Sequence, residues 1–112
     1  LDEEFVEKAL RLVEENMENP EFSVNNLCDD LGMSRSQLYR KFESITGLTP
    51  NDFIRSVRLK RAAQLLRDSS YNISEISDRV GFNSIKYFNK YFKEEFGFTP
   101  TQYRSNGSGE TK

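Results

Sequence analysis

Apolar side chains recur every three or four positions along most of the chain, which is the spacing of amphipathic α-helices. In residues 1–17 this spacing gives one apolar stripe, formed by Phe5, Ala9, Leu12 and Val13. With the capping residues between segments, the pattern predicts seven helices over residues 1–17, 23–31, 34–46, 49–66, 73–80, 84–96 and 99–104. The predicted fold class is therefore all-α.

The stretch from Leu31 to Pro50 has the plan of a helix-turn-helix. Gly32 falls in a tight turn, and Ser34 follows as an N-cap, because its hydroxyl can accept an unpaired amide of the first helical turn. Gly47 suits the left-handed position after a helix end. The inward face of the second helix carries Leu38, Phe42 and Ile45, and its polar outward face carries Ser36, Tyr39, Arg40 and Glu43. This plan is typical of a DNA reader, whose second helix contacts bases.

The same plan occurs a second time, from Val80 to Pro100. At an offset of 49 residues, Leu27, Leu31 and Gly32 correspond to Ile76, Val80 and Gly81. At an offset of 50, Leu38, Phe42, Gly47, Thr49 and Pro50 correspond to Phe88, Phe92, Gly97, Thr99 and Pro100. The second copy therefore carries one extra residue in its turn. A match of glycines, Thr-Pro pairs and apolar rows in one register indicates an internal repeat.

The second copy has an inward row of aromatic residues and an outward row of polar residues. Asn83 or Ser84 opens its second helix. The inward row is Phe88, Phe92 and Phe96, and the outward row is Lys86, Asn89, Lys90 and Lys93. The aromatic row could be read as a base-stacking platform, but its helical spacing favours a core. Tyr87 and Tyr91 flank this row, where their hydroxyls could reach a DNA backbone.

The helix predicted over residues 49–66 is apolar on two sides. One cluster is Phe53, Ile54 and Val57, and the other is Leu59, Ala62, Ala63 and Leu66. Such a helix packs against two partners, so we expect it to join the two copies. Its eighteen residues span roughly 27 Å, which is on the scale of the ~34 Å turn of DNA that separates successive major-groove segments.

These elements define one domain over residues 1–104. Its predicted parts are a scaffold helix in residues 1–22, a first helix-turn-helix in 23–48, a linker helix in 49–67 and a second helix-turn-helix in 72–104. Residues 105–112 are rich in glycine, serine and charge, and we expect them to be disordered.

No apolar run approaches the ~20 residues of a membrane span, and no signal peptide is visible.

Charge is distributed unevenly although the net charge is only −2. Residues 1–32 hold ten acids and two bases, whereas residues 33–67 hold eight bases and two acids. A local basic region is what attracts DNA phosphates within the ~10 Å screening length at 0.1 M salt.

The single cysteine, Cys28, corresponds to Ser77 in the repeat, and we interpret it as a small buried packing residue.

The residue types needed for catalysis are missing. The chain has no histidine and one cysteine, which excludes Ser-His-Asp and Cys-His catalysis and leaves no credible zinc site. The glycines lie at helix ends or in the tail, so no phosphate-cradling loop is predicted. We therefore predict no catalytic residue, no metal and no cofactor, and an enzyme is not the favoured reading.

Taken together, these motifs resemble the DNA-binding domain of the AraC/XylS family of bacterial transcription regulators. The second copy carries most of the resemblance, in the pattern I-x-x-I-x-x-x-x-G-F-x-S-x-x-Y-F-x-x-x-F-K-x-x-F-G-x-T-P-x-x-Y-R from Ile73 to Arg104. The linker helix adds R-L-K-R-A-A-Q-L-L from Arg58 to Leu66. One departure is Ser77, where the family usually has alanine. The stretch S-R-S-Q-L-Y-R-K-F…T-G-L-T-P-N-D-F-I-R-S-V-R-L-K-R-A-A, from Ser34 to Ala63, also resembles the C-terminal domain of hybrid two-component regulators.

The resemblance implies sequence-specific binding of double-stranded DNA at two adjacent major-groove segments. Its base-contacting positions fall on Ser36, Tyr39 and Arg40 in the first copy, and on Lys86, Asn89 and Lys90 in the second, with Ile85 beside them. Phosphate contacts are expected from Arg35, Lys41, Lys93 and the helix N-terminal amides, including those that follow Ser84.

The resemblance also implies partners and a compartment. RNA polymerase is one further partner, and in a hybrid regulator the receiver and sensor kinase domains of the same chain are others. We expect a monomeric domain in the cytoplasm, with an intact hybrid sensor anchored in the membrane. The alternative is a helical protein-interaction module that no longer reads DNA.

Overall fold

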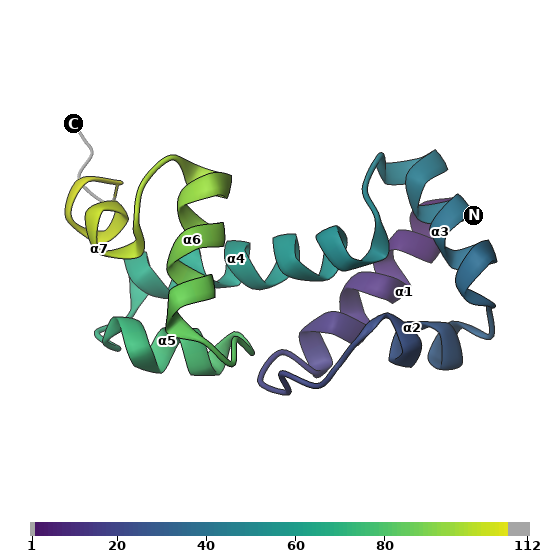
Figure 1. Ribbon diagram of the computed structural model, residues 1–112, viewed down its shortest axis with the longest axis horizontal. Helices are drawn as coiled ribbons and strands as arrows, with labels where there is room; N and C mark the ends of the chain where they lie inside the picture. Colours follow the sequence, from purple (N-terminus) through teal and green to yellow (C-terminus); the bar gives the residue numbers. More distant parts are fainter. Residues whose placement is uncertain (1, 108–112) are drawn as a thin grey trace. The chain divides into compact units, whose positions relative to one another are not determined.

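The structure is a computed structural model that describes residues 2–107 (Figure 1). Over this range the chain forms seven α-helices, one π-helical turn and no strand, so the all-α prediction is confirmed. The chain divides into two compact units, which we call the first lobe, up to Val57, and the second lobe, from Arg58. The elements are α1 (Asp2–Glu15), α2 (Val24–Leu31), α3 (Arg35–Thr46), α4 (Pro50–Asp68), α5 (Ile73–Arg79), α6 (Ile85–Phe96), α7 (Pro100–Gln102) and η1 (Tyr103–Gly107).

The core of the first lobe is built around Phe42 on α3. Its ring contacts Phe5 of α1 at a centroid distance of 5.2 Å and Phe53 of α4 at 4.9 Å. The remaining buried side chains of this core include Ala9, Val13, Phe22, Val24, Leu27, Cys28, Leu38 and Ile54. Cys28 is buried in this core as a free cysteine, which agrees with its interpretation as a packing residue.

The turn between α2 and α3 is made by Gly32, with φ at 67°. This left-handed conformation costs an L-residue conformational energy that glycine avoids. The Gly32 amide donates to the Asp29 carbonyl, and the next amide, that of Met33, donates to the Cys28 carbonyl over 2.9 Å. Ser34 then caps α3 by accepting the Gln37 amide, as the sequence predicts.

The second lobe repeats this arrangement. Phe92 on α6 is fully buried, and its ring contacts Tyr103 at 5.3 Å and Phe88 at 5.9 Å. Both Phe88 and Phe92 are inaccessible to solvent, so the aromatic row is core and not a stacking platform. Ser84 caps α6, which decides between the two candidates for its start.

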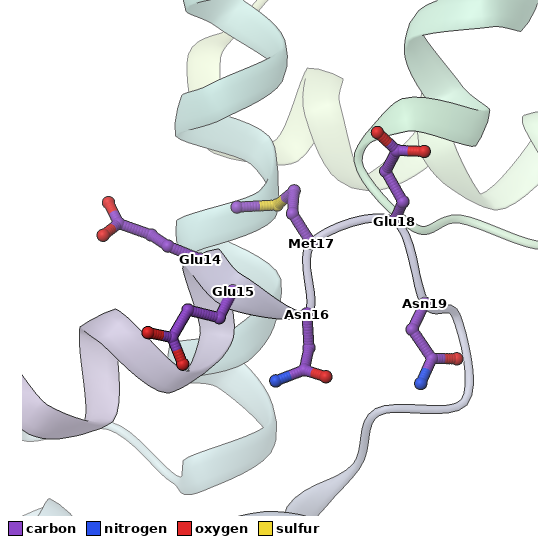
Figure 2. Close-up of a pocket in the computed structure, with 6 residues that line it drawn as sticks. All are labelled: Glu14, Glu15, Asn16, Met17, Glu18 and Asn19. Carbon is purple, nitrogen blue, oxygen red and sulfur yellow. The ribbon is translucent and has the colours of Figure 1, made fainter.

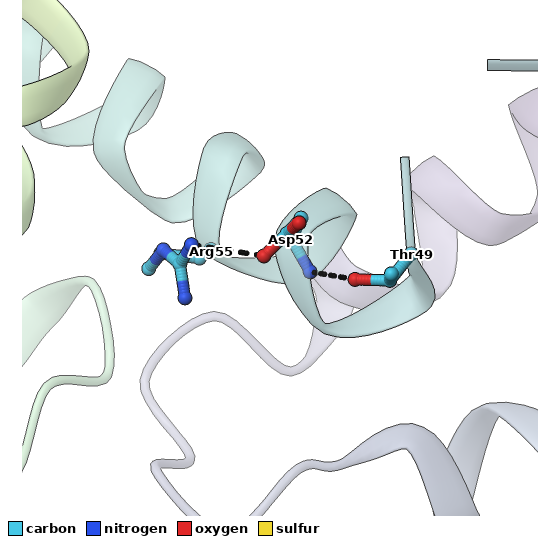
Figure 3. Close-up of polar contacts among 3 residues, drawn as sticks. All are labelled: Thr49, Asp52 and Arg55. Carbon is cyan, nitrogen blue, oxygen red and sulfur yellow. Dashed lines mark hydrogen bonds and ion pairs between the residues drawn. The ribbon is translucent and has the colours of Figure 1, made fainter. Parts of the chain in front are cut away.

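Helix α4 contributes one part to each lobe. Phe53 and Ile54 belong to the core of the first lobe, whereas Leu59, Ala62, Ala63 and Leu66 are buried in the part that belongs to the second. Its start is fixed by Thr49, whose Oγ1 accepts the Asp52 amide over 3.1 Å, and the Asp52 carboxylate pairs with Arg55 at 2.9 Å (Figure 3). Thr99 repeats this cap by accepting the Gln102 amide over 3.2 Å.

The end of the second lobe is more ordered than the sequence suggests. We expected disorder from Ser105, but Ser105–Gly107 continue the π-helical turn η1, and residues 108–112 lie outside the described range. The physical reason is the anchoring of the preceding residues. Arg104 donates to the backbone carbonyls of Leu66 and Ser69, and the Tyr103 hydroxyl accepts from Arg67 over 2.6 Å.

Candidate nucleic-acid interface

All ten residues predicted to contact DNA are accessible to solvent. Seven are exposed, namely Arg35, Ser36, Arg40, Lys86, Asn89, Lys90 and Lys93. Three are half-buried, namely Tyr39, Lys41 and Ser84. In the first lobe these side chains lie on α3, and in the second they lie on α6 or, for Ser84, at its N-cap. The opposite face of each helix is buried in the core, through Leu38 and Phe42 in α3 and through Phe88 and Phe92 in α6. Core packing therefore fixes which face of each helix is outward.

The outward face of α3 holds a side-chain network and two unengaged groups. Arg35 donates through Nη1 to Oδ1 of Asn25 over 2.9 Å and through Nη2 to the Tyr39 hydroxyl over 3.3 Å. Within the described residues, the side chains of Ser36 and Arg40 make no hydrogen bond or ion pair. The five N–H donors of the Arg40 guanidinium are therefore without a partner in the described part of the chain.

Lys41 lies apart from the other predicted contacts of α3. Its ammonium nitrogen lies 4.9 Å from the centroid of the Phe5 ring on α1, in a cation–π arrangement. The side chain is half-buried as a result. Lys41 would have to leave this ring to reach a phosphate, whereas Arg40 would not have to break a contact.

The outward face of α6 is basic and sparsely engaged. Ser84 accepts the Tyr87 amide over 3.4 Å, and the Lys90 ammonium lies 5.5 Å from the Tyr91 ring centroid. Lys86 and Asn89 have no side-chain partner among the described residues. Two large apolar or aromatic side chains lie on the same helix, Ile85 at 45% exposure and Tyr87 at 53%.

The acidic part of the first lobe is unsuited to bind phosphate. Its α1 carries Asp2, Glu3 and Glu4 in the first turn and no base in the last turn. A hollow at the end of α1 is lined by Glu14, Glu15, Asn16, Met17, Glu18 and Asn19 (Figure 2). Figure 2 shows the Glu18 carboxylate pointing away from those of Glu14 and Glu15. Elsewhere in residues 2–107, too, no group of acidic, cysteine or histidine side chains could hold a metal ion.

One basic residue counted in the sequence is removed from the surface. Arg58 is only 5% exposed, and its Nη1 donates to the Val80 carbonyl over 2.7 Å. Burial lowers the pKa of its guanidinium below the usual value by desolvation. Arg58 therefore supports the second lobe from inside and is not available to a phosphate.

Asn25 and Arg58 are two residues whose roles the sequence does not indicate. Each makes a hydrogen bond to a residue that is distant in the sequence. Asn25 accepts from Arg35, which is ten positions away, and Arg58 donates to the carbonyl of Val80, which is 22 positions away. The helical periodicity that locates the outward faces carries no signal for such contacts.

None of the helices in residues 2–107 combines the length and apolar character needed to cross a membrane.

These features define a double helix-turn-helix domain with one polar outward helix in each lobe. We call α3 the first reader and α6 the second reader. A sequence profile for a helix-turn-helix domain matches residues 27–106. A transcriptional regulator from Chromobacterium violaceum, described as AraC-type, superposes with a TM-score of 0.87 at 30% identity, covering 97% of this chain and 96% of that one. The chain belongs to the AraC-type helix-turn-helix family.

Two further similarities concern DNA and a longer chain. The DNA-binding domain of AdpA, a global transcriptional factor solved with a target DNA, superposes with a TM-score of 0.80 at 32% identity, covering 93% of this chain and 89% of that one. Histidine kinase P4 of Formosa agariphila is 48% identical over 108 residues, which are 96% of this chain and 8% of the kinase. The chain thus spans a small part of that relative.

Proposed function

We propose that this chain is a sequence-specific double-stranded-DNA-binding domain that serves as the output of a transcription regulator. The observation that carries the proposal is the pair of outward faces on α3 and α6. Each face is polar and basic, and each is fixed by a buried phenylalanine behind it. Five of the ten site residues, namely Ser36, Arg40, Lys86, Asn89 and Lys93, have no side-chain partner within the described residues. Its relative AdpA is solved with DNA on a domain of the same fold.

We assign a role to each side chain from its chemistry. Arg40 can bond the O6 and N7 atoms of guanine with two N–H groups, and Asn89 can pair with adenine in the same way. Ser36, Tyr39, Lys86 and Lys90 accompany them on the base-facing positions. Lys93 and Lys41 suit phosphate, as do the first-turn amides of α6 beside Ser84.

The domain works in this proposal as one part of a longer regulator. The support is its 48% identity to a segment of a histidine kinase, of which it spans 8%. Receiver and sensor kinase domains of the same chain would then control it, RNA polymerase would be its partner at the promoter, and the domain would act in the cytoplasm. It carries no catalytic step, and we expect the isolated domain to be a monomer.

Selection of duplexes from a random pool tests this function. We expect an enriched sequence, and binding to it that falls by orders of magnitude between 50 and 200 mM salt if about six to ten phosphates are contacted. The scrambled duplex should bind far more weakly at every salt concentration. A protein-interaction module would give no enriched sequence, and that outcome would overturn the proposal.

A further inference from the structure

Three side chains from two helices form a chain of hydrogen bonds at the start of the first reader. Asn25 lies on α2, and Arg35 and Tyr39 lie on α3. Arg35 donates to Oδ1 of Asn25 over 2.9 Å and to the hydroxyl of Tyr39 over 3.3 Å. Its Cζ atom lies 5.4 Å from the centroid of the Tyr39 ring, so the guanidinium contacts both the ring and the oxygen of Tyr39.

The direction of these bonds follows from the chemistry of arginine. A guanidinium can only donate hydrogen bonds, so Oδ1 of Asn25 and the oxygen of Tyr39 must both accept. A tyrosine hydroxyl has one proton of its own to donate. Because that proton is not used in the bond from Arg35, it is available to an acceptor outside the protein. The amide nitrogen of Asn25 and the remaining N–H groups of Arg35 are donors as well.

The second lobe lacks this network. Ser74 corresponds to Asn25 at an offset of 49 residues, and Ile85 and Asn89 correspond to Arg35 and Tyr39 at an offset of 50. Ile85 can neither donate nor accept a side-chain hydrogen bond, and it is 45% exposed. The repeat therefore shows that the helix-turn-helix is built without the network, which makes the network a feature added to the first reader and not a requirement of its fold.

Held in this way, Tyr39 would present its hydroxyl donor at a defined place in the major groove of the bound DNA. The acceptors in the major groove are N7 of either purine, O6 of guanine and O4 of thymine, whereas cytosine presents the N4 amino donor, which cannot pair with a donor. N7 is the acceptor that both purines share. We propose that Tyr39 donates its hydroxyl proton to a purine N7 in the first half-site, and that Asn25 is the positioning residue that holds Arg35 and, through it, Tyr39. This inference rests on the proposed DNA-binding function and names the atom class that the first reader recognises.

The test uses the duplex selected by the parent domain. The base pair at which Tyr39→Phe loses discrimination is located first, and its purine is then replaced by the 7-deaza analogue, which lacks only the N7 acceptor. We expect the parent domain to lose about fivefold in affinity, the size of one hydrogen bond. Tyr39→Phe and Asn25→Ala should bind the natural and 7-deaza duplexes equally well.

Two further variants separate positioning from general effects. Asn25→Asp keeps an acceptor for Arg35, so it should keep the N7 discrimination while binding all duplexes more weakly through its added negative charge. Ser74→Ala, at the matching position of the second lobe, should leave that discrimination at the parent value. Melting temperatures should agree among the parent and the Asn25 and Ser74 variants, because both residues are exposed.

The outcomes distinguish this inference from the function on which it rests. A parent domain that selects no sequence overturns both. A parent domain that selects a sequence, together with Asn25→Ala that still discriminates the 7-deaza duplex like the parent, overturns the positioning role alone. Sensitivity to a thymine and to no purine overturns the contact of Tyr39 with a purine N7. Loss of discrimination in Asn25→Asp overturns the positioning role of Asn25.

Discussion

Arg58 and Val80 are joined by a buried hydrogen bond of 2.7 Å, in which the guanidinium of Arg58 donates to the carbonyl at the end of α5. Val80 is inaccessible to solvent, and the turn to the second reader begins at the next residue, Gly81. At an offset of 49 residues, the matching position in α1 is Ala9, which is also buried. Arg58 thus brings a charged donor into the second lobe at a position that corresponds in sequence to a buried alanine in the first.

Arg58→Ala should destabilise the second lobe by about 1–3 kcal/mol, because it leaves a buried carbonyl without its donor. Chemical denaturation of the variant gives the free energy of unfolding, and hydrogen exchange locates the loss in α5 and α6. Arg61→Ala on the same helix is the matched control. Arg61 is exposed, so its loss should change the stability by no more than about 0.5 kcal/mol. Equal stabilities for the two variants would show that the buried bond contributes nothing.

Phe92→Ala should cost roughly 3–5 kcal/mol of stability, as a large truncation in a fully packed core. Phe92 is inaccessible to solvent and contacts Phe88, Phe96 and Tyr103. Denaturant unfolding monitored by circular dichroism measures the change. Tyr87→Ala on the exposed side of α6 should stay near the parent value. A melting temperature within a degree or two of the parent would contradict the inward assignment of Phe92.

Arg40→Ala should weaken specific binding by about 1–3 kcal/mol while leaving the melting temperature almost unchanged. The structure removes a rival explanation, because Arg40 forms no ion pair with Glu43 or with another described residue. Duplex selection with the variant measures the effect. We expect the preference to disappear at a single base pair and to persist elsewhere. A uniform loss over all positions would assign Arg40 to phosphate.

Lys90→Ala and Lys93→Ala should have different effects, since the two side chains lie almost one helical turn apart on α6. Loss of Lys90 should change the base preference within one half-site. Loss of Lys93 should weaken binding to all sequences alike and lower the salt slope by about one. Both quantities come from affinity titrations with specific and scrambled duplexes between 50 and 200 mM salt. Identical, sequence-independent losses would give the second reader a purely electrostatic role.

Most of the fold can be predicted from the sequence, because the residues that begin and end each helix act on neighbours only a few positions away. Ser34 and Gly47 bound α3 through hydrogen bonds to residues three or four positions away. Thr49 and Thr99 do the same for the helices that follow each reader. The inward rows follow from the helical period alone, and the repeat supports each assignment twice.

The rest depends on contacts that helical periodicity does not encode. Asn25 and Arg35 meet only because α2 and α3 are brought together by the turn at Gly32. In the sequence, Arg58 cannot be distinguished from the exposed basic residues near it, and only the fold shows that its guanidinium donates to the Val80 carbonyl. The turn at Ser105–Gly107 depends on Arg104 reaching Leu66 and Ser69. The DNA contacts of the ten site residues remain predictions, because base recognition depends on a partner as well as on the chain.

The extra residue of the second copy limits what can be exchanged between the lobes. The turn hydrogen bonds match in both, from Met33 to Cys28 and from Phe82 to Ser77. Ser34 follows Met33 directly, whereas Asn83 separates Phe82 from Ser84. An engineer who wants to retarget the domain can therefore transplant outward side chains from one reader helix to the other, but must leave each helix on its own turn. Grafting a turn across would advance or delay the start of the helix by one residue, about 100° of rotation, and would turn the recognition face away from its target.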